Sequence, residues 1–186
     1  MVLRLIDPPP DALEILRKNV LPAGDSTVDD AHQLSTGTPQ PIYNSTIQAL
    51  DESHLLAEAR LTGWQYILLS GPKSDQIDSV VEVAQVGDIK DKGSPLSPDV
   101  RYPAAYGVAI NNAITEAENV SSDYDLRMLR VPSVSLLAVW LHDDLKGDPL
   151  FPVYPAPTML KQQSMFTETA LTEALRPLIK QRYLKG

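Results

Sequence analysis

The residues best suited to chemistry in this sequence are a histidine followed by two aspartates. An imidazole beside carboxylates can bind a divalent metal ion or exchange protons with a substrate, so His142, Asp143 and Asp144 are the candidate catalytic residues. His142 and Asp144 are the candidate metal ligands. Consecutive strand residues point to opposite faces, so one ion could bind all three only if the chain turns here. We favour a solvated hairpin loop that continues through residues 145–149 over a metal or acid–base site.

The rest of the sequence offers little support for known catalytic arrangements. Asp29, Asp30 and His32 lie in a polar stretch, where such residues usually form side-chain turns and contact water. The chain contains no cysteine, which excludes thiolate nucleophiles, disulfides and iron–sulfur clusters. It also lacks a zincin helix, a nucleophile elbow, a Walker A loop and a Rossmann glycine pattern. We therefore expect no cofactor.

A proline-bearing stretch over residues 146–157 is the candidate interaction segment. It contains a lysine followed by two overlapping PxxP units, and the candidate contact residues are Phe151, Pro152, Tyr154 and Pro155. Polyproline II segments are bound by aromatic-lined grooves of partner proteins. The alternative, which we favour, is that the stretch lies extended over the protein's own surface with both aromatic rings tucked in.

The charge and length of the chain narrow the classes of partner. Its 186 residues include 16 basic and 24 acidic side chains, for a net charge of −8. Binding to nucleic acid needs a basic surface, so we expect no nucleic-acid partner. The longest apolar run, residues 136–141, is too short to cross a bilayer, and the N-terminus shows no signal-peptide pattern. We expect a cytoplasmic protein with no membrane partner.

Hydrophobic spacing and turn residues predict four helices and four strands. The expected helices begin after Pro8–Pro10, cover residues 51–60, carry the apolar stripe from Tyr106 to Val120, and begin at Thr167. Pro177 should kink or split the last helix. The expected strands cover residues 64–70, 79–86, 124–131 and 134–142. Residues 22–45 are expected to form an ordered arm, around the same or a neighbouring subunit, and residues 88–101 a polar loop.

The order of these elements indicates an α+β fold. A β-β-α-β-β core flanked by helices predicts an antiparallel sheet of about four to five strands with helices packed on it. We divide the chain into an N-terminal helical arm, residues 1–60, packed on a core domain, residues 61–186, and expect a single structural domain overall. Residues 134–141 are apolar on both faces, so this strand needs cover on two sides. The middle helix can supply one cover, and the terminal helices or a second subunit the other.

Two functional classes follow from these features. The first is a non-catalytic interaction or accessory domain that self-associates as a dimer and binds a protein partner; it rests on the doubly apolar strand and the long proline-bearing connections. The second is a small-ligand or metal-dependent enzyme with a site near Trp140, His142 and Asp143. We favour the first, and a His142 side chain that points into bulk solvent with no convergent polar group would remove the second.

Overall fold

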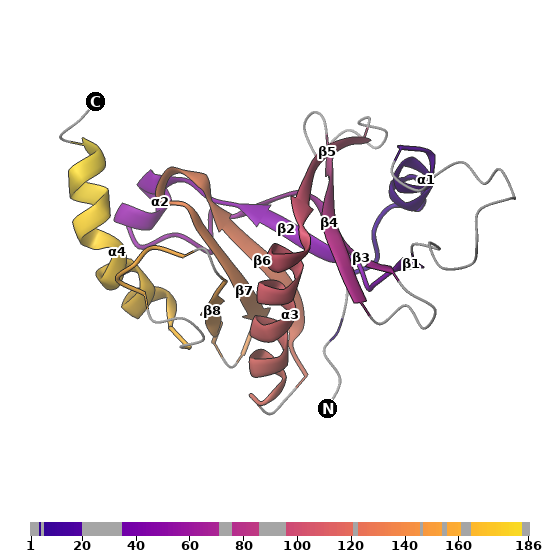
Figure 1. Cartoon of the computed structure of the whole chain (residues 1–186). Coiled ribbons are helices and arrows are strands. Elements are labelled where there is room, and N and C mark those ends of the chain that lie inside the picture. The colour runs from indigo at the N-terminus through magenta and orange to yellow at the C-terminus, as the bar shows by residue number, and fades with distance from the viewer. Residues whose placement is uncertain are drawn as a thin grey trace, which may run out of the picture. The chain divides into compact units, whose positions relative to one another are not determined.

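The computed structural model describes residues 4, 6–19, 35–70, 76–85, 96–120, 123–145, 147–153, 156–160 and 165–183 (Figure 1). These residues form the helices α1 (Pro10–Asn19), α2 (Ile47–Asp51), α3 (Ala104–Glu118) and α4 (Glu168–Tyr183). The strands are β1 (Ser35–Thr36), β2 (Gln40–Asn44), β3 (Arg60–Ser70), β4 (Gln76–Gln85), β5 (Leu96–Pro103), β6 (Asp125–Val131), β7 (Leu136–His142) and β8 (Leu150–Pro152). No helix in this described part combines the length and the apolar character needed to cross a membrane.

The chain divides into two compact units, and neither is a continuous stretch of sequence. Unit 1 comprises Met1–Leu5, Ile42–Leu61 and Ala109–Gly186, and unit 2 comprises Ile6–Pro41 and Thr62–Val108. The chain therefore passes from one unit to the other within β2, β3 and α3. The domain boundary expected after residue 60 lies at the start of β3, which begins at Arg60. Residues 1–60 belong partly to unit 1 and partly to unit 2.

Unit 2 is built on antiparallel strands. Its strands follow the order β5-β4-β3, and β1 also pairs with β3. α1 packs against β4 and β5 and buries Ala12 and Leu16. The first turns of α3 lie very close to the sheet, because a Cβ added at Gly107 would come within 2.7 Å of Ile77 Cγ2 and 3.0 Å of Val80 Cγ2. Glycine thus permits a close helix–sheet approach here.

A polar link joins β4 to β5 in unit 2. An Arg101 guanidinium nitrogen lies 2.6 Å from Asp78 Oδ2, and Arg101 Nε donates to Ser79 Oγ at 3.0 Å. The Ser79 hydroxyl donates to Asp78 at 2.8 Å. Hydrogen bonds from Ser79 and then from Arg101 lower the pKa of Asp78, because they stabilise its charged form.

Unit 1 contains a mixed sheet. Its strands follow the order β2-β6-β7-β8, in which β2 runs parallel to β6 and the other neighbours are antiparallel. A 3-10 turn, η2 (Pro132–Val134), joins β6 to β7, and Ser135 after it has a φ of 52°. The core of this unit unites residues of the sheet, of the α2 region, of α4 and of two connecting turns, namely Leu50, Leu55, Leu129, Val131, Val134, Leu136, Trp140, Leu150, Leu160, Leu171, Leu175 and Ile179.

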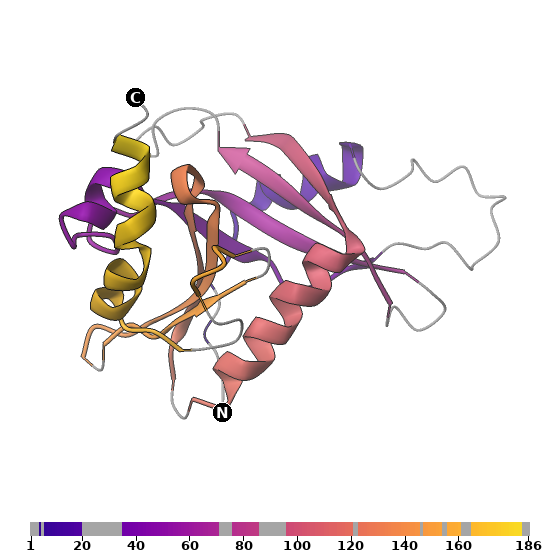
Figure 2. The same ribbon diagram turned by 60° about the vertical axis from the view of Figure 1, so that its left-hand side comes forward.

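The doubly apolar strand is β7, and its residues from Leu136 to Leu141 are all buried, as the sequence indicated. Figures 1 and 2 show α4 on one side of β6 and β7, and the part of α3 that belongs to unit 1 on the other. Cover for both faces of β7 therefore comes from this chain. A second subunit, which the sequence left open as cover for the strand, is not needed for that purpose.

The α+β class is confirmed, but the expected sheet of four to five purely antiparallel strands is wrong. The described residues contain eight strands, and the β2–β6 pair is parallel. The additional strands fall in segments for which no strand was expected. β1 and β2 lie in the expected arm, β5 begins in the expected polar loop, and β8 lies in the proline-bearing stretch that was expected to be extended. β2 lacks the alternation of apolar residues that marks a strand, and both β2 and β5 contain proline, which is uncommon within sheets.

The helices differ from expectation in two places. The helix expected over residues 51–60 is wrong, because α2 covers Ile47–Asp51 and shares only Asp51 with that range. α2 begins after Thr46, whose side chain accepts a hydrogen bond from the Ala49 N–H and caps the helix. α4 continues as one helix through Pro177, so the split that was one of the two expectations there does not occur. Its start at Glu168 is the predicted one, and the Thr167 hydroxyl accepts from the Ala170 N–H at 3.2 Å.

Candidate functional site

Strand register gathers the candidate residues on one face of the sheet in unit 1. Asp125 lies opposite His142, and Arg127 lies opposite Trp140, across the antiparallel β6–β7 pair. Side chains two residues apart on a strand share a face, so all four belong to the same face. Farther along these strands the same face carries Leu129, Val131 and Leu136, which join the core with α2 and α4. The polar residues thus lie where the apolar core ends.

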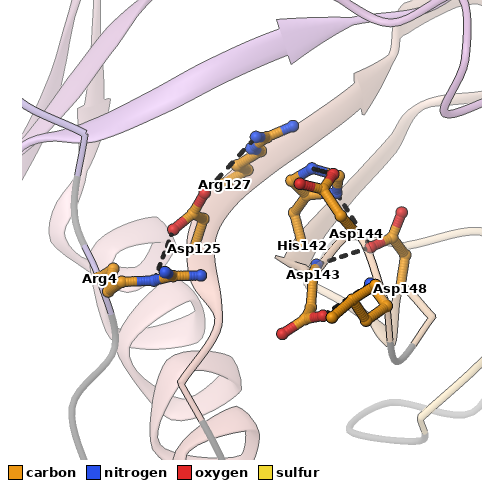
Figure 3. Close-up of polar contacts among 8 residues, drawn as sticks. Arg4, Asp125, Arg127, His142, Asp143, Asp144 and Asp148 are labelled. Carbon is orange, nitrogen blue, oxygen red and sulfur yellow. Dashed lines mark hydrogen bonds and ion pairs between the residues drawn. The ribbon is translucent and has the colours of Figure 1, made fainter.

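His142 contacts two carboxylates through its two ring nitrogens (Figure 3). Its Nδ1 lies 3.1 Å from Asp148 Oδ1, and its Nε2 lies 3.3 Å from Asp144 Oδ1. Asp148 Oδ1 also accepts from the Asp143 N–H at 3.1 Å. The Asp143 carboxylate instead accepts from the Leu145 N–H at 2.8 Å, which forms a side-chain turn. The structure therefore brings His142 and Asp144 together and directs the Asp143 carboxylate to its own loop.

Asp148 is the member of this cluster that the sequence analysis missed. It lies six residues after His142, beyond the tip of the loop between β7 and β8. The signal that could have identified it is the Gly147-Asp148-Pro149 sequence. Such residues are typical of a turn, and a turn here reverses the chain and brings Asp148 back beside the end of β7. Gly147 has a φ of 84°, a conformation that suits glycine.

An aromatic and cationic cluster adjoins the histidine. Trp140 makes edge-to-face contacts with Tyr43 of β2 and with His142, with ring centroids 5.4 Å apart in both pairs. The Arg127 guanidinium carbon lies 5.1 Å from the Tyr43 centroid and 4.8 Å from the Trp140 centroid. Within the described residues, two buried donors of this cluster, Arg127 Nε and Trp140 Nε1, have no hydrogen-bond partner. The aromatic rings thus provide the main contacts for this guanidinium.

The N-terminal segment completes the polar end of this face. The Arg4 N–H donates to the Tyr124 carbonyl at 2.8 Å, and the Leu126 N–H donates to the Arg4 carbonyl at 2.9 Å. Arg4 Nε lies 3.0 Å from Asp125 Oδ1, whereas Arg127 approaches the other oxygen of Asp125 only to 3.7 Å (Figure 3). Asp125 therefore lies between two guanidinium groups, and the closer contact is with Arg4.

Both ring nitrogens of His142 face carboxylates of the loop that follows β7. Among the described residues no group of three or more histidine or carboxylate side chains is arranged to hold a metal ion. The polar candidates Asp29, Asp30 and His32 lie outside those residues.

The proline-bearing segment forms part of the protein's own sheet. Phe151 and Pro152 are buried in β8, and Phe151 pairs with Val139 of β7. This placement corresponds to the interpretation in which the segment covers the protein itself. Tyr154 and Pro155 lie outside the described residues, so partner binding through this segment stays a prediction.

One further buried titratable group lies in unit 2. Tyr66 of β3 is only 1% exposed, and its hydroxyl has no hydrogen-bond partner among the described residues. Burial raises the pKa of Tyr66 to about 12, because the phenolate is poorly solvated there. A hydroxyl buried without a partner affects the free energy of unfolding, so Tyr66 is a determinant of stability.

Comparisons of this chain with models of protein families, with curated proteins and with solved structures found no match.

Proposed function

We propose that this protein is a non-catalytic interaction domain that self-associates as a dimer. The observation that carries the proposal is that three large apolar side chains are exposed on the connection between β7 and α4 in unit 1. Leu145 is 92% exposed, Met159 39% and Met165 58%. Large apolar side chains in water favour association, and methionine adapts its shape to a partner surface.

Two of these residues project from firmly held backbone. Phe166, next to Met165, exchanges two hydrogen bonds of 2.8 and 2.9 Å with Leu150 of β8. Leu160, next to Met159, is buried in the core of unit 1. A surface that is already ordered loses little conformational entropy when a partner binds, which supports its use as an interface.

The geometry around His142 supports the non-catalytic part of the proposal. The residues that could best do chemistry contact one another within a single loop, and Arg127 is held against two aromatic rings. The absence of cysteine is compatible with a reducing cytoplasm, and the net charge of −8 disfavours nucleic acid and anionic membranes as partners.

Sedimentation equilibrium of the full chain tests the dimer. We expect a reversible dimer whose dissociation constant rises at least about tenfold, or 1.4 kcal/mol, in the Met159→Gln/Met165→Gln variant. Val108→Gln is the matched control, because Val108 is a comparably exposed apolar residue of unit 2 and should leave association unchanged. Circular dichroism verifies that each variant folds. A wild-type chain that remains monomeric over the accessible concentration range contradicts the proposal.

The alternative of a small-ligand site near Trp140, His142 and Asp143 has one observation in its favour. The buried donors Arg127 Nε and Trp140 Nε1 have no partner among the described residues, and buried donors are usually satisfied. A thermal-shift series with phosphate, small carboxylates and divalent metal chlorides tests it. A concentration-dependent rise in Tm that is lost in Arg127→Met supports this alternative, and unchanged Tm values across the series remove it.

A further inference from the structure

Sulfur occurs in this protein only as methionine. The chain contains no cysteine and four methionines, and the structure describes three of these, all in unit 1. Met128 of β6 is fully buried, whereas Met159 and Met165 are exposed. Cysteine thiolates are the usual first targets of a peroxide. In the described part of this chain, the exposed thioethers are therefore the sulfur atoms that a peroxide can reach.

We propose that Met159 and Met165 are oxidation sites through which a peroxide weakens self-association. The inference rests on the proposed function, because it assigns a regulation to side chains that the dimer would bury. With hydrogen peroxide, the thioether sulfur takes one oxygen, so that an S–O bond forms and the O–O bond breaks. The other oxygen leaves as water with both protons. The sulfur loses two electrons and the peroxide gains them.

Both side chains project from backbone that is fixed by hydrogen bonds. Met159 lies in a turn in which the Leu160 N–H donates to the Pro157 carbonyl at 2.9 Å. Met165 precedes Phe166, whose N–H donates to a carbonyl of β8 at 2.8 Å. Their exposure therefore belongs to the folded state, and oxidation at either position needs no unfolding.

The buried methionine provides an internal reference. Met128 lies in β6, which pairs with β2 on one side and β7 on the other. A peroxide can reach its sulfur only when these strands open, and the opening of core strands costs much of the free energy of unfolding. Met159 and Met165 should thus be oxidised at least about tenfold faster than Met128.

Oxidation changes the side chain from an apolar thioether to a polar, chiral sulfoxide. Burial of the sulfoxide oxygen against a partner costs desolvation that the thioether does not require. The modified side chains should therefore oppose association. Methionine sulfoxide reductases restore the thioether with two electrons from a dithiol and release the oxygen as water, so the change is reversible.

Association and oxidation should compete for the same side chains. A dimer that buries Met159 and Met165 shields their sulfur atoms, so the peroxide reacts with the monomer. At a fixed excess of peroxide, the rate of oxidation at both positions should fall as the protein concentration rises through the dissociation constant.

Peptide mapping by mass spectrometry and sedimentation equilibrium of the full chain, before and after treatment with hydrogen peroxide, test the inference. Oxidation of Met159 and Met165 should raise the dissociation constant at least about tenfold, with unchanged circular dichroism, and reductase treatment should reverse the rise. Met159→Leu/Met165→Leu is the matched control, because it retains Met1 and Met128. Whatever the dissociation constant of this variant, peroxide should not change it.

The outcomes separate this inference from the proposed function. A reduced wild-type chain that remains monomeric contradicts the dimer and, with it, an effect of oxidation on association. A reduced dimer whose dissociation constant stays the same after oxidation of Met159 and Met165 overturns this inference alone. The same holds if the oxidation rate of the dimerising chain is independent of protein concentration, or if Met128 reacts as fast as the exposed methionines.

Discussion

The substitution of Tyr66 by phenylalanine should raise stability and change its dependence on pH. The hydroxyl is buried and has no hydrogen-bond partner among the described residues. An unsatisfied buried hydroxyl costs about 1–3 kcal/mol of desolvation, which phenylalanine avoids while keeping the ring. At neutral pH we therefore expect Tyr66→Phe to be about 1 kcal/mol more stable than the wild type.

The stability difference between Tyr66→Phe and the wild type should grow in alkaline solution. Burial raises the pKa of Tyr66 from 10.0 in the unfolded chain to about 12 in the folded one. The neutral phenol is thus favoured in the folded state, and its contribution is fully present below pH 10.0 and lost as the pH rises through about 12. The full pKa shift of Tyr66 corresponds to roughly 3 kcal/mol in the free energy of unfolding, of which about 2 kcal/mol should be lost by about pH 11.5. Tyr66→Phe should not show this loss.

Urea unfolding followed by far-UV circular dichroism measures the effect without interference from tyrosinate absorption. The free energy of unfolding is determined at neutral pH and at several alkaline values for the wild type, Tyr66→Phe and Tyr106→Phe. Tyr106 is a half-buried tyrosine of α3, so its variant should retain the alkaline loss of the wild type. If Tyr66→Phe loses stability with pH as steeply as the wild type, burial of Tyr66 does not control the alkaline limit and the reasoning is refuted.

Three further predictions concern packing, acid stability and a link between helices. Gly63→Ala should destabilise the protein by about 1–3 kcal/mol in thermal unfolding, because a Cβ there would lie 2.5 Å from the Val83 carbonyl oxygen. Because the pKa of Asp78 is lowered in the folded state, its carboxylate should add stability above the unfolded pKa of 3.8, and this stability should be lost as the pH falls through the folded value. Solvent exposure limits the contribution to less than about 1 kcal/mol. In acid titrations of the free energy of unfolding, Asp78→Asn should lack this contribution. Glu168→Ala should raise hydrogen exchange at the Leu56 amide and cost about 1 kcal/mol, whereas Glu168→Gln should retain the 3.0 Å bond.

The sequence predicted elements well where residue spacing alone decides the structure. The strands over β3, β4, β6 and β7, the helix α3 and the start of α4 all follow from short apolar runs bounded by turn residues, a helical stripe or a capping threonine. The Pro132-Ser133 connection lies between two of the expected strands. It is the 3-10 turn η2, followed by Ser135 in a left-handed conformation.

The missing strands required information that is not local. β2 has five residues, including Pro41, and becomes a strand because β6 lies beside it in parallel. Such pairing depends on residues far away in the chain, and no spacing within the segment signals it. The same holds for the candidate site, where His142 and Asp144 could be chosen by residue type. Their relation to Asp148, Arg127 and Arg4 depended on a turn and on strand register.

The hydrogen bond between Leu56 and Glu168 also has a consequence for the synthesis of the chain. These residues are 112 positions apart, and the core that α2 and α4 share contains Leu50, Leu55 and Leu171. At about 5–20 residues per second, a ribosome needs roughly 6–22 seconds to reach α4 after it has made α2. During that interval the apolar residues near α2 lack their final cover, so a nascent chain that pauses within this window presents a surface for chaperones or for aggregation.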